Sequence, residues 1–322
     1  MPPPLTLPRK LPFYESKLME KKRGEYFIWI DNVKGIAIVL VVLNHCGYLA
    51  GKENLQWFQH AVPLFLFCSA YLLRKKDIHN YFSKKRLLRL WKRIIGPYLL
   101  VEILAVALLL FADIFININI HIDINRFIKS AGLGPGSYFP VVYIQCWLLI
   151  PFLVLLKHRY SFSKSLLIFT VLCAILEFFF ITISENRVWL WRLLAVRYLM
   201  ILFVGVYYEE FVKRKALLIA LVILSIVVAI IDIYIFPFDN LGWNGYHFYT
   251  SFYLLLLIPS VMKLSFDWLA LIGKYSYEIF LLQLGYFIIA NFMINRGGMF
   301  HLGIIILLCS ILIAFAEKNS IR

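Results

Sequence analysis

Charged residues are scarce in this sequence. They make up 16% of its 322 residues, whereas 62% are hydrophobic and the mean hydropathy is +0.79. Soluble domains carry roughly a quarter of their residues as charges. The composition therefore excludes a soluble globular protein and predicts an integral membrane protein with no separate soluble domain.

Cysteines are also few, and their spacing is uninformative. The five cysteines form no CxxC pair and no Cys/His pattern with metal-ligand spacing, and all of them fall in apolar stretches. We therefore expect neither a disulfide framework nor a metal site. Residues 1–25 lack the apolar core of a signal peptide, so the first apolar segment is expected to remain as an anchor.

Acidic residues are outnumbered: 18 Asp and Glu stand against 33 Lys and Arg. The chain divides into ten apolar spans of about 20 residues each, the length that a bilayer core requires. Most basic residues fall in alternate connections between these spans, and the other connections hold only five. The spans are 28–49, 55–73, 94–115, 138–156, 165–183, 189–208, 216–236, 248–266, 275–294 and 300–316.

This charge pattern predicts the topology. Because positive residues stay on the cytoplasmic side, both termini are expected in the cytoplasm. The prediction is an all-α, multi-pass bundle of about ten transmembrane helices in the cell (cytoplasmic) membrane. Its parts are a cytoplasmic segment 1–27, a transmembrane domain 28–316 and a tail 317–322. The basic excess then reflects topology and contact with membrane lipids, and no nucleic-acid partner is expected.

The first span carries three groups that lipid disfavours, namely Asp31, Lys34 and His45. Lys34 and His45 are eleven residues apart, so on a helix they project within about 20° of each other and ~16 Å apart along the axis. Asp31 lies on the same stripe. An interfacial ion pair and a structural hydrogen bond could account for the three. Alternatively they are functional, because intramembrane ionisable groups commonly are and histidine exchanges protons near neutral pH.

A second basic feature precedes the third span, in "SKKRLLRLWKRIIGPY" (Ser83 to Tyr98). Arg86, Arg89 and Arg93 recur at three- and four-residue spacing and so share a helix face. Plain anchoring at the membrane surface explains their sign. A row of guanidinium groups also suits a phosphate-rich ligand, because each group can bind phosphate oxygens with two hydrogen bonds.

Other polar groups lie deep in later spans. Glu102, Glu177 and Arg197 should each face a partner or a water-filled cavity, because a lone charge in lipid is costly. Before the fourth span, "GLGPGSYFP" (Gly132 to Pro140) is dense in glycine and proline and predicts a sharp bend. Together these residues predict a polar interior, either channel-like or catalytic.

The order of these motifs resembles the membrane-bound acyltransferase-3 family, which includes O-acetyltransferases of bacterial surface polysaccharides. "KGIAIVLVVLNH" (Lys34 to His45) matches the family's basic residue, ten positions and histidine. Segments 63–76, 92–98, 197–208 and 271–283 resemble its later helices. Two departures stand out: Ala70 replaces a usual glycine, and Gln283 stands where the family often has histidine, so no catalytic role is carried to it.

The resemblance implies transfer of an acyl group, usually acetyl, from cytoplasmic acyl-coenzyme A (acetyl-CoA as cosubstrate) to a hydroxyl of a glycan or lipid-linked sugar. Lys34 and the three arginines, Arg86, Arg89 and Arg93, would hold the coenzyme A phosphates. His45 would be the general base, with a covalent acyl-histidine relay as the other option.

The resemblance also implies supporting roles for the buried charged residues. Asp31 would orient Lys34, Arg197 would stabilise the oxyanion, and Glu102 and Glu177 would support the site. The alternative function is a transporter or exporter of a glycan or its lipid-linked precursor, with the buried charges serving proton coupling. The sequence shows no convincing internal repeat, which disfavours that alternative.

Overall fold

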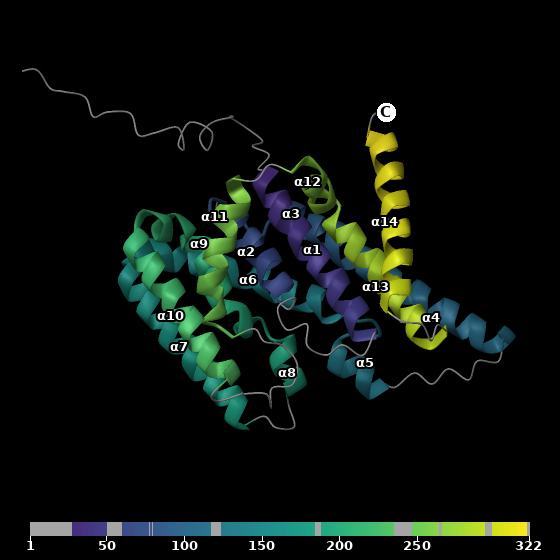
Figure 1. The fold of residues 1–322 in the computed structure, drawn as a ribbon, viewed down its shortest axis with the longest axis horizontal. Coiled ribbons are helices and arrows are strands. Elements are labelled where there is room, and N and C mark those ends of the chain that lie inside the picture. The colour runs from purple at the N-terminus through teal and green to yellow at the C-terminus, as the bar shows by residue number, and fades with distance from the viewer. Residues whose placement is uncertain are drawn as a thin grey trace, which may run out of the picture.

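The chain folds as a helical bundle, shown as a computed structural model in Figure 1. All regular elements in the described residues are helical, which confirms the all-α fold class. The structure describes residues 28–49, 60–76, 78, 80–116, 124–183, 188–234, 247–263, 266–293 and 298–320.

Each of the ten predicted spans contains helix in its described part. The elements are α1 (Ile28–Leu49), α2 (Ala61–Leu73), α3 (Lys84–Leu90), the π-helical turn η2 (Trp91–Ile95), α4 (Gly96–Ile116), α5 (Ile124–Ser130), α6 (Tyr138–Arg159), α7 (Phe162–Ile183), α8 (Val188–Leu193), the 3₁₀ turn η3 (Ala195–Tyr198), α9 (Leu199–Lys213), α10 (Lys215–Tyr234), α11 (Thr250–Lys263), α12 (Asp267–Lys274), α13 (Ser276–Met293) and α14 (Gly298–Ser320).

Five helical segments of the described chain are long and apolar enough to cross a bilayer. They are Ile28–Gly47, Lys84–Phe115, Tyr138–Arg159, Phe162–Phe180 and Gly298–Lys318. Other apolar helices are shorter, so the total of about ten spans and the side of each terminus remain predictions. The start of α1 and the end of α14 do lie at the same end of the bundle (Figure 1).

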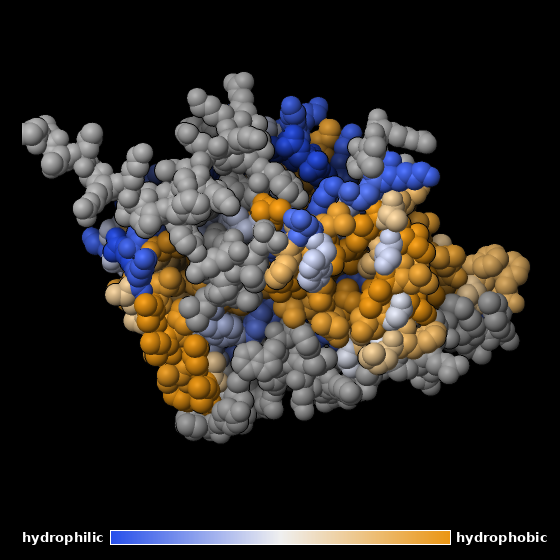
Figure 2. Space-filling model, turned by 45° about the horizontal axis from the view of Figure 1, so that its top comes forward, coloured by the Kyte–Doolittle hydropathy of each residue, from blue (hydrophilic) through white to orange (hydrophobic). Residues whose placement is uncertain are grey.

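The outer helices expose apolar side chains. Ile114 on α4 is 76% exposed and Phe178 on α7 is 68% exposed, whereas only Ile28 and Val39 are exposed among the described side chains of α1. Figure 2 shows broad hydrophobic flanks with hydrophilic side chains gathered above them. Apolar surfaces of this extent are unfavourable in water and suit a lipid environment.

Glycine allows α1 to approach α12 very closely. A Cβ at Gly273 would overlap the backbone carbonyl oxygen of Asp31, and one at Gly35 would overlap that of Leu269. The two glycines thus let the two backbones touch near Asp31 and Lys34. This contact fixes the start of α1, where the candidate site begins.

Replacing Gly273 with alanine is expected to lower the thermal unfolding temperature of the purified protein by several degrees. The added methyl must push α12 away from α1, and overpacking of this kind costs about 1–3 kcal/mol. Gly303 on α14 is the matched control, because a Cβ there would meet no atom within 4 Å. Equal unfolding temperatures for the two variants would show that the α1–α12 contact tolerates a side chain.

A similar close contact lies between α2 and α9. A Cβ at Gly205 on α9 would lie 2.7 Å from the Cβ of Ala70 on α2. Gly205 therefore leaves room for the methyl group of Ala70, one of the two residues that depart from the resemblance described above.

Two predicted spans are interrupted, and a third begins earlier than expected. The span 189–208 contains an extended residue, Leu194, between α8 and η3, and the span 275–294 is entered through a break at Tyr275. The helix of the third span begins already at Lys84 and includes η2, where the Gly96 N–H bonds the Trp91 carbonyl. Pro97 lacks an N–H, so the regular pattern cannot continue at this point.

Candidate active site

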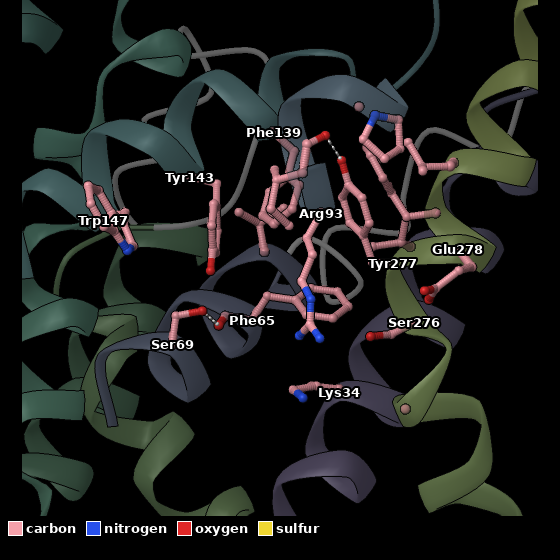
Figure 3. A pocket seen from close by; sticks show the side chains of 18 of the residues that line it. Lys34, Phe65, Ser69, Arg93, Phe139, Tyr143, Trp147, Ser276, Tyr277 and Glu278 are labelled. Carbon is pink, nitrogen blue, oxygen red and sulfur yellow. Dashed lines mark hydrogen bonds between the residues drawn. The ribbon is translucent and has the colours of Figure 1, made fainter. Parts of the chain in front are cut away.

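A cavity of about 900 Å³ runs through the bundle. Its walls come from α1, α2, the α3–η2 segment, the turn before α6, α6 itself and the junction of α12 with α13. Figure 3 shows side chains from these elements pointing into one space. Segments far apart in the sequence therefore share a single site, as ligand pockets in helical bundles commonly do.

One end of the cavity is strongly basic. Seven Lys and Arg side chains line the described wall against a single acidic one, Glu278. All four predicted phosphate-binding residues are among them; the seven are Lys34, Lys76, Arg86, Arg89, Lys92, Arg93 and Lys274. A hydrogen bond to Glu317 raises the pKa of Lys274, which keeps that side chain charged. We call this part of the cavity the basic end.

At the basic end, Arg86 has a buried hydrogen-bond donor without an acceptor. Its Nη1 atom is buried and has no hydrogen-bond partner, and its guanidinium carbon lies 5.8 Å from the ring centroid of Tyr81. A buried guanidinium nitrogen without an acceptor is costly. An anionic ligand in the cavity would satisfy it.

Lys34 is held at the basic end by Asp31. The Lys34 Nζ lies 3.0 Å from the Asp31 Oδ1, and Asp31 is buried beneath it. The ion pair fixes the ammonium group at the cavity wall while leaving two of its donors for other acceptors. In Figure 3 the Arg93 side chain extends into the same space toward Lys34.

His45 lies at the other end of the cavity. Its Nδ1 is 3.0 Å from the Oε1 of Gln283, and its ring packs edge-on against Phe287 with centroids 5.9 Å apart. An amide oxygen at this position suits the tautomer with the proton on Nδ1, which leaves the lone pair of Nε2 for another partner. The arrangement suits a base that accepts a proton at Nε2.

The predicted bend before α6 packs against this histidine. Ala131 and the glycines Gly132 and Gly136 have positive φ angles of 55°, 154° and 91°. A Cβ at Gly136 would lie 3.3 Å from the Cε1 of His45, so a larger residue would crowd the imidazole. Glycine is favoured here by both its φ angle and this contact.

Glu102 holds that bend in place. Its Oε1 accepts a hydrogen bond of 2.6 Å from the Ser137 hydroxyl, and its Oε2 accepts one from the Leu133 N–H. The Tyr98 hydroxyl donates to the Ala131 carbonyl. Glu102 is thus buried with partners and positions the turn beside His45 without lining the cavity.

Glu177 and Arg197 lie elsewhere. Glu177 on α7 pairs with His247 and accepts a hydrogen bond from the Phe248 N–H, so it fastens the start of α11. Arg197 is buried on η3, and neither residue is among the described cavity lining. Arg192 lies nearer to the cavity, since its guanidinium sits 4.2 Å from the ring centroid of Tyr138, which lines it.

The sequence as a whole resembles one known family. A family model described as an acyltransferase domain matches residues 27–316, nearly the whole chain. The chain belongs to the acyltransferase-3 family. No curated protein and no solved structure matches it.

In this acyltransferase-3 protein the sequence motifs identify only part of the site. Gln283, which contacts His45, carries no signal except that the family often has histidine at its position. The Ser137 contact to Glu102 and the cavity wall on α6 were not predicted either. Their side chains become neighbours of the site only through the packing of helices.

Proposed function

We propose that the protein is a membrane O-acyltransferase that moves an acyl group from acyl-CoA to a hydroxyl of a surface polysaccharide or lipid-linked sugar, with acetyl as the first candidate. Membership of the acyltransferase-3 family supports acyl transfer. The proposed donor and base are supported by one observation. Lys34 and the three arginines line one end of the same cavity that His45 lines at the other end.

Coenzyme A fits the basic end. Lys34, Arg86, Arg89 and Arg93 offer charged hydrogen-bond donors for its phosphates, and the buried Nη1 of Arg86 supplies one donor without a protein acceptor. Along α1 the distance from Lys34 to His45 is about 16 Å, which is comparable to the length of the pantetheine arm. The thioester would therefore lie beside His45 while the phosphates remain at the basic end.

His45 would act on the acceptor. Its Nε2 takes the proton of the acceptor hydroxyl as the oxygen attacks the thioester carbonyl. The carbon–sulfur bond then breaks, and the departing thiolate takes the proton from the imidazolium to leave as free coenzyme A. Arg197 lies behind the cavity wall, so we assign it at most an electrostatic influence on the developing oxyanion.

The family match favours transferase chemistry over transport of a glycan, and no second function is proposed. Purified protein in lipid nanodiscs with acetyl-CoA and a crude glycan acceptor is expected to release coenzyme A thiol only when the acceptor is present. Thiol release that does not depend on the acceptor would contradict the proposed transfer.

Replacing Gln283 with leucine is expected to lower kcat for acyl transfer roughly 10- to 100-fold while KM for acetyl-CoA stays unchanged. Leucine keeps the volume but removes the acceptor that holds the Nδ1–H of His45, so the ring loses its tautomer and orientation. Steady-state rates over a range of acetyl-CoA concentrations measure both constants.

Gln283→Glu is the conservative control, because it keeps an oxygen acceptor at the same distance. It should recover most of the lost kcat. If glutamate and leucine variants behave alike, or if KM rises with no change in kcat, then Gln283 does not position His45 for catalysis.

A further inference from the structure

The cavity wall formed by α2 and α6 has a composition of its own. Three aromatic residues on α6, Phe139, Tyr143 and Trp147, line it together with Phe65 and Ser69 of α2. The α6 residues are four positions apart, so they project from one face of the helix. Figure 3 shows this face turned toward the cavity, opposite Arg93 and Lys34.

This wall extends between the two ends of the site. Gly136, just before α6, touches His45, whereas Trp147 packs against Tyr81 with ring centroids 4.8 Å apart, beside Arg86. α6 begins at Tyr138, two residues after Gly136, and rises about 14 Å from there to Trp147. This rise is close to the ~16 Å from His45 to Lys34 on α1, so the two helices frame a path of similar length.

Two hydroxyl groups interrupt the aromatic wall near its middle. In Figure 3 the hydroxyls of Ser69 and Tyr143 are turned toward each other across the gap between α2 and α6. The Ser69 hydroxyl donates to the carbonyl of Phe65 at 3.1 Å, which leaves its oxygen as an acceptor. Both side chains remain partly accessible from the cavity.

We propose that this wall is the subsite for the pantetheine arm of the donor, and that Ser69 and Tyr143 bind an amide of that arm. The inference rests on the proposed function. Pantetheine alternates short methylene segments with two amides, each of which needs a donor and an acceptor when it leaves water. Phe65, Phe139 and Trp147 would pack against the methylenes, and the two hydroxyls would meet the amide.

The spacing identifies which amide. The amide farther from the sulfur, between β-alanine and pantoate, lies about eight bonds from it, or roughly 10 Å in an extended chain. Tyr143 lies five residues into α6 from Tyr138, a rise of about 8 Å, and the turn of Gly136 and Ser137 separates Tyr138 from His45. With the thioester at His45, the second amide therefore reaches the two hydroxyls.

The position of the wall favours the donor over the acceptor sugar as its occupant. A sugar could also stack on aromatic rings and bind hydroxyl groups. However, the wall lies between His45 and the basic end, so an acceptor placed there would block the path from the phosphates to His45.

The test compares two ligands in nanodiscs by equilibrium binding: acetyl-CoA, and adenosine 3′-phosphate 5′-diphosphate, which has the phosphates of coenzyme A but no arm. Tyr143→Phe is expected to weaken acetyl-CoA binding about tenfold, the usual effect of one lost hydrogen bond. Affinity for the nucleotide should not change. Ser69→Ala should likewise weaken binding of acetyl-CoA but not of the nucleotide, and it replaces Tyr143→Phe in the test if the tyrosine variant does not fold.

Tyr207→Phe is the matched control. The Tyr207 hydroxyl is hydrogen-bonded to Ser165 at 3.1 Å, so it reproduces a tyrosine–serine pair outside the described cavity lining. It should bind both ligands as the wild type does. An unchanged affinity of Tyr143→Phe for acetyl-CoA, or an equal loss for both ligands, would overturn the subsite. If the wild-type protein binds no acetyl-CoA, the proposed donor is wrong and the subsite falls with it.

Discussion

Replacement of His45 by alanine is expected to lower the rate of acyl transfer by about three orders of magnitude. General base catalysis contributes about 10²- to 10⁴-fold, and the cavity offers the acceptor hydroxyl an imidazole whose Nδ1 is already bound by Gln283. The rate is measured as transfer of radiolabelled acetyl from acetyl-CoA to glycan in inverted membrane vesicles, with protein amounts matched by immunoblot.

His301→Ala provides a control for the loss of a buried histidine. His301 on α14 is hydrogen-bonded to Tyr286 and packs near the same ring, Phe287, that contacts His45. It is not among the described residues that line the cavity, so its removal should affect stability more than rate. Full activity in His45→Ala would show that another group takes the proton.

The second large effect is expected at the basic end. The double change Arg89→Ala/Arg93→Ala should weaken acetyl-CoA binding about a hundredfold. A hydrogen bond to a charged group is worth about 1.5–3 kcal/mol, two are removed, and the low end applies because both arginines are exposed. The maximal rate at saturating acetyl-CoA should fall much less, since His45 and Gln283 remain in place. Binding and initial rates over a range of acetyl-CoA concentrations separate the two quantities.

Lys84→Ala/Lys85→Ala is the charge-matched control. Both lysines are exposed on the same helical segment, yet neither lines the cavity. Their loss removes two positive charges from the membrane surface without touching the proposed phosphate site. If both double variants bind acetyl-CoA equally well, then the arginines only anchor the helix.

Much of the fold was predictable because the bilayer restricts it so strongly. Apolar length suffices to predict an all-helical chain and the places of its five long apolar helices. The interruptions were harder to predict. The break at Leu194 and the π-helical turn before Gly96 depend on local hydrogen bonding, which a hydropathy pattern does not record.

The residues that line the cavity were predictable as a group where they share one helix. Lys34 and His45 lie on α1, and Arg86, Arg89 and Arg93 lie on one helical segment, so spacing alone places each group. Contacts between helices could not be derived in this way. Gln283 is separated from His45 by 238 residues, and only the packing of α13 against α1 brings them together.

Buried charge was a less specific indicator of the cavity lining than the helical spacing of Lys34, His45 and the three arginines. Glu102, Glu177 and Arg197 satisfy the rule that a charge inside a membrane bundle is rarely left in lipid. Glu102 and Glu177 are bound by a turn and by a helix start, and none of the three lines the cavity. A deep charge therefore indicates a polar interior but does not separate support of the fold from chemistry.

The most direct test of the central claim is mass spectrometry of surface glycans from cells that carry the wild-type protein, His45→Ala or no protein. Acyl transfer to a glycan through His45 predicts acetylated glycan in the first case and the same glycan without acetyl groups in the other two. Equal acetylation in all three, or loss of the surface glycan itself in the absence of the protein, would contradict the account.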